Sequence, residues 1–290
     1  MRIKHWIKNI LILFPLVFSG NLLNQALYFK ISIGVFVFCV ASSIIYIFND
    51  LQDIERDKQH PLKRKRPFPS GEVSLKMGWI LIGCLCFILI YTLLWADLPF
   101  VYTALYILLN IIYSLGGKNI PLLDVSILAS GYLIRLLWGG YLCGTGVSEW
   151  MFLTVLASSF YLGFGKRKNE LKKYGNNGRA ILKEYGTEFL DKSYQLFGTL
   201  PIALFSVTCM DNTTTVAQIL KTKTAVDMFI IGMGGAEFTI PLVILICLRY
   251  NLILDSPNNS GDPVEVVFND RILIGMIMLY IICIISVLYL

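Results

Sequence analysis

Nine apolar runs, each long enough to cross a bilayer, constrain the fold of this chain more than any other feature. A helix crosses the hydrocarbon core, about 30 Å thick, with about 20 residues. The runs lie at residues 9–27, 31–49, 77–95, 98–114, 121–143, 150–165, 194–210, 226–248 and 271–290. We therefore predict an all-α polytopic membrane protein, with residues 1–290 forming a single transmembrane domain.

The composition agrees with a membrane protein. Hydrophobic residues make up 56% of the chain and charged residues only 15%, whereas about a quarter of the residues in soluble domains are charged. The net charge of +6 is explained by basic loops on one side of a membrane, so we predict contact with anionic lipids or substrates and no nucleic-acid partner.

The basic residues also predict the orientation, because cytoplasmic loops retain Lys and Arg. With nine spans, the opposite face would carry only Lys30, Lys221 and Lys223 of the 25 Lys and Arg residues. We therefore expect a cytoplasmic N-terminus. Residues 18–21 make a poor cleavage site for a signal peptide, so we expect the first helix to be retained.

Polar clusters follow the second, fourth, sixth and eighth apolar runs. This repetition is expected if helical hairpins surround a central cavity that opens to the cytoplasm. The predicted loops on the other face are short or lack such polar clusters. We therefore predict the functional site at the cytoplasmic ends of the helices.

The first cluster is acidic. Asn49 and Asp50 end the second run, and Asp53 and Asp57 follow at spacings that share one face of a helix. Adjacent carboxylates repel one another unless a cation joins them, and hard oxygen ligands suit Mg²⁺. We predict a magnesium site formed by these four residues.

A basic run, residues 63–66, follows the acidic cluster. Its arginines suit bidentate contact with phosphate, but cytoplasmic retention alone also explains such a run. The same two interpretations stay open for Lys166 and Arg167 after the sixth run.

The fifth run carries two ionisable residues, Asp124 and Arg135, after a glycine-containing turn with Tyr113 and Lys118. Ionisable groups at membrane depth are usually functional. Arg135 either grips a buried anion or bonds the carbonyls of neighbouring helices, and Glu237 in the eighth run suits a protonated structural acid.

Other catalytic chemistries have little support. His5 and His60 have no acid placed to orient them, so a histidine base is not expected. The seven cysteines lie in or beside apolar runs and form no CxxC pair, which argues against a disulfide framework or a zinc site.

The acidic motif at the end of the second helix of a nine-helix protein resembles the UbiA superfamily of intramembrane prenyltransferases. Within it, the chain is most similar to the decaprenyl-phosphate phosphoribosyltransferases. That similarity is carried by residues 4–9, 57–67, 113–118, 124, 131–135, 165–167, 249–250, 262–265 and 270–271. Gly117 departs from the pattern, which has a larger apolar residue before the lysine.

The resemblance implies Mg²⁺-dependent transfer of 5-phosphoribose from phosphoribosyl diphosphate to a polyprenyl phosphate in a bacterial inner membrane, with the active site facing the cytoplasm. It implies catalytic roles for Asp50, Asp53, Asp57, Tyr113 and Lys118. The implied substrate-binding residues are Lys8, Asn49, Arg56, Lys63, Arg66, Asp124, Arg135, Lys166 and Arg167.

Two alternatives stay open. A prenyltransferase that moves a prenyl group from its diphosphate to an aromatic or glycerol-based acceptor would use the same aspartates, but the surplus of cytoplasmic cations favours a donor with an additional phosphate. A transporter would use Asp124, Arg135 and Glu237 near the membrane midplane. The densest polar clusters instead lie at the cytoplasmic helix ends, which favours an enzyme.

Overall fold

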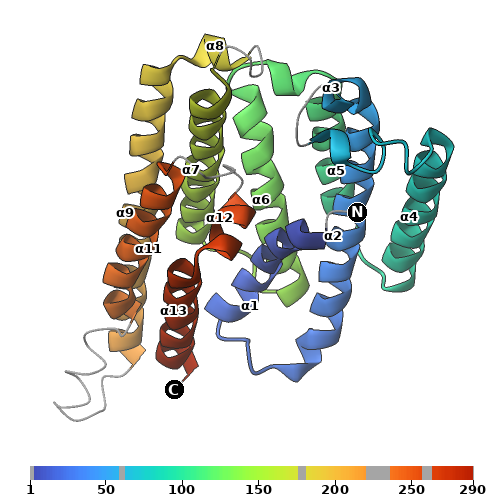
Figure 1. Cartoon of the computed structure of the whole chain (residues 1–290). Helices are drawn as coiled ribbons and strands as arrows, with labels where there is room; N and C mark the ends of the chain where they lie inside the picture. The colour runs from blue at the N-terminus through green and yellow to red at the C-terminus, as the bar shows by residue number, and fades with distance from the viewer. Residues whose placement is uncertain (1–2, 59–62, 176–180, 220–235, 257–262, 290) are drawn as a thin grey trace. The chain divides into compact units, whose positions relative to one another are not determined.

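The computed structural model describes residues 3–58, 63–175, 181–219, 236–256 and 263–289, and every regular element within these ranges is a helix. The all-helical prediction is confirmed. In chain order, with η for 3-10 helices, they are η1 (Ile3–Leu13), α1 (Phe14–Phe18), α2 (Gln25–Gln52), α3 (Ile54–Lys58), η2 (Lys63–Lys65), α4 (Leu75–Trp95), α5 (Val101–Leu115), η3 (Gly117–Asn119), α6 (Leu123–Cys143), α7 (Glu149–Tyr174), α8 (Ile181–Tyr185), α9 (Thr187–Ile219), η5 (Ala236–Thr239), α11 (Ile240–Leu254), α12 (Pro263–Asn269) and α13 (Arg271–Tyr289) (Figure 1).

Five helical segments among the described residues are long and apolar enough to cross a membrane: Gln25–Gln52, Leu75–Trp95, Leu123–Cys143, Glu237–Leu254 and Arg271–Tyr289. Two shorter apolar helices cover His5–Phe18 and Val101–Leu115. Helices α7 and α9 carry more charge because each continues beyond its apolar segment. These features are those of an integral membrane protein.

The first predicted span differs from the helices in the structure. This span, 9–27, is replaced by a helical segment at residues 3–18, and α2 begins at Gln25 behind the side-chain cap of Asn24. The helical segment begins before the predicted span, where Trp6 donates to Ser43 Oγ on α2 at 3.1 Å. Asn9 also bonds to α2, donating to Cys39 Sγ at 3.2 Å. The predicted eighth span, 226–248, falls in part on residues 226–235, which lie outside the described ranges; from residue 236 on, the chain is helical as η5 and then α11.

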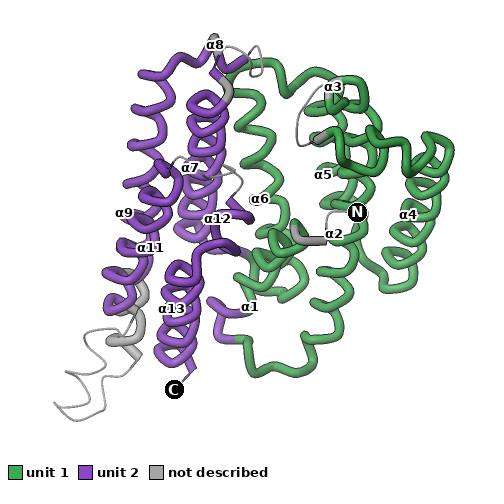
Figure 2. Tube along the Cα trace, viewed as in Figure 1, with its two compact units in different colours: residues 1–16, 21–146 green, residues 17–20, 147–290 purple. Residues whose placement is uncertain are grey.

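The chain divides into two compact units (Figure 2). Unit 1 contains residues 1–16 and 21–146, and unit 2 contains residues 17–20 and 147–290. Within unit 1, α2 packs against η1, α4, α5 and α6. Within unit 2, α7 packs along α9, and α11 contacts both α9 and α13.

Close helix packing in unit 1 depends on two glycines. The Trp138 indole on α6 donates to the carbonyl of Gly34 on α2 at 3.2 Å, and a Cβ atom at Gly34 would lie 3.0 Å from the same indole nitrogen. A Cβ atom at Gly139 would lie 2.2 Å from the carbonyl oxygen of Ile12 in η1. Small residues allow helix backbones to approach closely in membranes, so Gly139 fixes the contact between η1 and α6.

A buried guanidinium joins the helices of unit 1. Arg135, only 5% exposed, donates to Asn9 Oδ1 at 2.7 Å, to the Gly131 carbonyl at 2.6 Å, and to Ser42 Oγ and the Tyr106 hydroxyl at 3.1 Å each. All these acceptors are uncharged, and they come from η1, α2, α5 and α6 itself. The structure thus shows Arg135 bonding neighbouring helices.

In unit 2, polar side chains connect three helices. Tyr161 on α7 and Tyr194 on α9 both donate to the side-chain oxygen of Asn251 on α11. The two tyrosine rings stack with centroids 4.9 Å apart. Hydrogen bonds of this kind satisfy polar groups that lack water in the membrane.

Asp270 links α11 to the start of α13. It accepts a hydrogen bond from Arg249 Nη2 at 2.7 Å and from the backbone N–H of Leu273 at 2.6 Å. The bond from Arg249, together with the backbone bond, holds the pKa of Asp270 below its usual value. The ionised carboxylate therefore stabilises the beginning of α13.

We expect Gly139→Ala to lower the unfolding temperature in detergent, because the added methyl meets the backbone of η1 and overpacking costs about 1–3 kcal/mol. Gly83→Ala in α4 is the matched control, since nothing lies within 4 Å of a Cβ there. Circular dichroism melting curves measure both. Equal melting temperatures for the two variants would contradict the close contact.

We expect Asp270→Asn to lower the unfolding temperature at pH 7 and to matter less in acid. A depressed pKa stabilises the fold above the pKa of the unfolded state, about 4, and this contribution is lost as the pH falls through the folded-state pKa. Melting curves at pH 7 and about pH 3 compare this variant with Glu72→Gln, an exposed control. A pH-independent difference would contradict the assignment.

Candidate active site

The acidic cluster lies where α2 ends and α3 begins. Helix α2 ends at Gln52, and Asp53 forms its C-cap. The backbone N–H of Asp53 bonds to the Asn49 carbonyl at 3.0 Å, and that of Asp57 bonds to the Asp53 carbonyl at 2.8 Å. Helical hydrogen bonding thus continues across the boundary, and the acids remain close together.

Arg66 joins two of the acids. Its Nη1 lies 3.3 Å from Asp50 Oδ1 and 2.6 Å from Asp57 Oδ2. Asp57 is only 2% exposed, so its charge depends on a nearby cation, because a buried unpaired carboxylate is unfavourable. Arg66 is the last residue of the basic run and directly follows η2, so its contacts hold this run against the end of α2.

The third acid pairs with a different segment. Lys118 Nζ in η3 lies 2.5 Å from Asp53 Oδ1. Nearby, the Ser114 hydroxyl donates to the side-chain oxygen of Asn49, which joins α5 to α2. The structure therefore brings together Asn49, the three aspartates, Arg66 and Lys118 within unit 1.

These oxygens have the chemistry of a magnesium site. Among the residues that the structure describes, no three His, Cys, Asp or Glu side chains converge as a metal-binding group. Asp50 and Asp57 nevertheless both approach the same guanidinium nitrogen, Nη1 of Arg66. Their oxygens can thus share one positive centre, and oxygen donors of this type suit Mg²⁺.

A cavity of about 330 Å³ adjoins the acidic cluster. Apart from Asp50 and Arg66, its walls are largely apolar, and it lies between α2, α4 and the segment that follows η2. The lining residues are Tyr46, Ile47, Asp50, Arg66, Pro67, Phe68, Val73 and Leu81. An apolar group bound in this cavity would therefore lie beside Asp50 and Arg66.

The other predicted residues occupy several places. Tyr113 is half-buried on α5 beside Ser114, Lys8 is half-buried on η1, and Asp124 is fully buried in the first turn of α6. Lys166 and Arg167 belong to α7 in unit 2, where Arg167 is fully buried and pairs with Glu170 at 2.7 Å. The side chains of Arg56 and Lys63, and all of His60, lie outside the described part.

Ser114 was not predicted as a site residue, although it follows Tyr113 in the recognised motif. Its contact with Asn49 spans 65 positions in sequence, so spacing alone does not reveal it.

Gly117, the glycine that departs from the family pattern, lies where a larger side chain would have little space. A Cβ atom at Gly117 would lie 3.0 Å from the Ile112 carbonyl oxygen.

The sequence has relatives over nearly its full length. The decaprenyl-phosphate phosphoribosyltransferase of Mycolicibacterium smegmatis is 32% identical over 282 residues, which cover 94% of this chain and 86% of that protein. The enzyme of the same name from Corynebacterium glutamicum is 28% identical, and the alignment covers 100% of this chain and 85% of that enzyme.

The fold also matches a solved structure, a UbiA homolog from Archaeoglobus fulgidus bound to GPP and Mg²⁺. The TM-score is 0.68 at 16% identity, covering 100% of this chain and 98% of that one. The model of the UbiA prenyltransferase family matches residues 10–175, which include the whole cluster around Asp53. The chain therefore belongs to the UbiA prenyltransferase family.

Proposed function

We propose that this protein transfers 5-phosphoribose from phosphoribosyl diphosphate to a polyprenyl phosphate and releases diphosphate. The observation that carries the proposal is the full-length similarity to proteins named decaprenyl-phosphate phosphoribosyltransferase. The cluster of three carboxylates with Arg66 and Lys118 supports it, since it joins possible metal ligands to phosphate-binding cations.

In this proposal Asn49, Asp50, Asp53 and Asp57 hold Mg²⁺. The bound ion would neutralise the charge that develops on the departing diphosphate. In the present structure Arg66 and Lys118 occupy these carboxylates. When the acids bind the metal, the two cations become available to phosphate oxygens, for which arginine offers a bidentate fork.

The reaction requires positioning more than proton transfer. A phosphate oxygen of the lipid attacks C1 of the ribose, and the bond from C1 to the diphosphate oxygen breaks. The nucleophile is already an anion, so no strong base is needed, and holding the reactants together supplies most of the acceleration. We propose Tyr113 beside the reacting groups and Lys8, Arg56, Lys63 and Asp124 as further substrate-binding residues. Lys166 and Arg167 are proposed for the same role from the sequence motif alone. The predicted substrate contact of Arg135 is replaced by its bonds to neighbouring helices.

We also propose the membrane arrangement. One transmembrane domain of nine crossings would place the N-terminus and the acidic cluster on the cytoplasmic side of a bacterial inner membrane. The basic residues support this orientation, because only Lys30, Lys221 and Lys223 would lie on the other face. A cavity open to the cytoplasm would admit the water-soluble donor, while apolar helix walls would hold the lipid.

Prenyl transfer is the alternative activity, because the family model that matches this chain is that of the UbiA prenyltransferases. The solved homolog from Archaeoglobus fulgidus was bound to GPP, a prenyl diphosphate. That chain is 16% identical to this one, so it shows the fold alone. The two activities differ in which substrate carries the diphosphate, which a direct assay can distinguish.

The assay incubates purified protein with Mg²⁺, ribose-labelled phosphoribosyl diphosphate and a polyprenyl phosphate, followed by extraction into organic solvent. We expect the label to enter the lipid fraction. If the label stays in water while a prenyl diphosphate and an aromatic acid yield a prenylated product, the phosphoribosyl proposal is wrong and prenyl transfer replaces it.

We expect Asp53→Asn to reduce label transfer by at least about 100-fold, because the amide keeps the shape but loses the charge that binds metal. Asp53 is partly exposed, so the variant should remain folded. Glu55→Gln is the matched control, since Glu55 is exposed and pairs with Lys58 within α3. Full activity of Asp53→Asn would remove Asp53 from the proposed metal site.

We expect Arg66→Gln to bind Mn²⁺, a spectroscopic substitute for Mg²⁺, more tightly than the unchanged protein does. The guanidinium competes for Asp50 and Asp57, and its removal leaves two carboxylates that need a cation. Electron paramagnetic resonance titrations measure the affinity without turnover. Arg64→Gln, an exposed neighbour, is the control, and weaker Mn²⁺ binding by Arg66→Gln would contradict the competition.

A further inference from the structure

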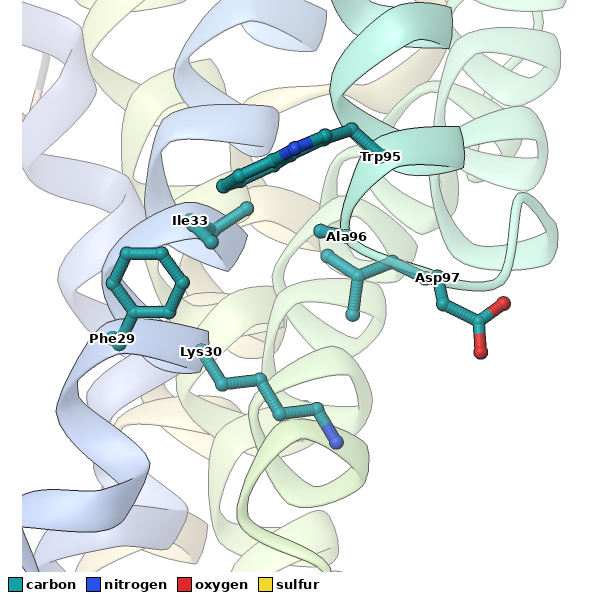
Figure 3. Close-up of a pocket in the computed structure, with 7 residues that line it drawn as sticks. Phe29, Lys30, Ile33, Trp95, Ala96 and Asp97 are labelled. Atoms are coloured by element: carbon teal, nitrogen blue, oxygen red, sulfur yellow. The ribbon is translucent and has the colours of Figure 1, made fainter.

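A second cavity in unit 1 lies far from the acidic cluster. It measures about 280 Å³ and is formed by the start of α2 and the end of α4 (Figure 3). Phe29, Lys30 and Ile33 come from α2, and Trp95, Asp97 and Leu98 come from the end of α4 and the turn after it. The walls are mainly apolar, with one cationic and one anionic side chain at the edge.

The position of this groove follows from helix geometry. Lys30 and Asp50 both belong to α2 and are separated by 20 residues, which corresponds to about 30 Å along the helix. This distance equals the thickness of the hydrocarbon core, about 30 Å. In the proposed membrane arrangement, the groove therefore lies at the membrane surface opposite the candidate active site.

Aromatic side chains support an interfacial position. Phe29 and Trp95 form an edge-to-face pair with ring centroids 6.2 Å apart. Both are largely exposed, at 68% and 61%, although they are large apolar residues. Tryptophan is enriched where hydrocarbon meets the headgroups of lipids, so an exposed aromatic pair suits this boundary.

The two charges of the groove are not paired with each other. Neither Lys30 nor Asp97 forms an ion pair with any residue that the structure describes, and the Lys30 ammonium lies 5.1 Å from the centroid of the Tyr141 ring. Asp97 has a φ of 49°, in the left-handed region. Figure 3 shows Lys30 extending from α2, whereas Asp97 lies on the turn after α4 with its carboxylate directed away from the Phe29 and Trp95 rings.

We propose that this groove binds the headgroup of phosphatidylethanolamine, a phospholipid with a phosphate and a primary ammonium. Lys30 would contact the phosphate and Asp97 the ammonium, which donates hydrogen bonds to the carboxylate. An anionic lipid without an amine would leave Asp97 unpaired. The methylated ammonium of phosphatidylcholine has no N–H to donate.

The size of the groove supports a headgroup rather than a whole lipid. Sites that enclose drug-sized ligands measure about 300–1,000 Å³, and this groove is slightly smaller. The acyl chains would therefore stay in the bilayer along the exposed faces of α2 and α4. Such a lipid would join the two helices at the end opposite Asp50 and stabilise unit 1.

The test measures lipid binding to delipidated protein in detergent, by native mass spectrometry with phosphatidylethanolamine, phosphatidylglycerol and phosphatidylcholine of matched chains. We expect phosphatidylethanolamine to bind about tenfold more tightly than either other lipid, as one additional charge-assisted hydrogen bond implies. Equal binding of all three lipids, or tighter binding of phosphatidylglycerol, would overturn the proposal.

Two variants separate the two contacts. Asp97→Asn should remove the preference for phosphatidylethanolamine over phosphatidylglycerol, whereas Lys30→Gln should weaken binding of both lipids. Lys76→Gln is the control, because this exposed lysine lies at the opposite end of α4. A preference that survives Asp97→Asn would also overturn the proposal. None of these readouts depends on turnover, so they are independent of the proposed reaction.

Discussion

Three carboxylates where α2 ends and α3 begins are held by cations from two other segments of unit 1. Asp50 and Asp57 share Arg66, and Asp53 pairs with Lys118. The cations come from segments on either side of α4 and α5 in the sequence. Electrostatic attraction therefore holds the segment after η2 and the turn after α5 against the same helix end, which in the proposed reaction is where the diphosphate leaves.

A second cation supports this arrangement from inside the unit. The buried guanidinium of Arg135 bonds to side chains of η1, α2 and α5. In the hydrocarbon, polar groups must find partners within the protein, so these bonds restrict how the helices can move. Ser42, one of the partners, lies two turns before Asn49 on α2. The buried network therefore helps to orient the acidic end of that helix.

The sequence predicted the helical fold because apolar runs of membrane length leave few alternatives, and it predicted the acidic cluster because its spacing is local. It did not predict the partners of the acids. The contacts of Asp53 with Lys118 and of Asn49 with Ser114 each span 65 positions, and only the packing of α5 against α2 creates them. The first helix boundary was wrong because Trp6, which precedes the apolar run, is held against α2 by a hydrogen bond to Ser43 that hydropathy does not reveal.

The most direct test of the account is whether metal and diphosphate meet on the acidic end of α2. Electron–nuclear double resonance of Mn²⁺-loaded protein with phosphoribosyl diphosphate detects phosphorus nuclei bound next to the metal. The account predicts a phosphorus coupling that requires both protein and donor and that disappears in Asp50→Asn. A coupling that is unchanged in that variant, or absent from the unchanged protein, would contradict it.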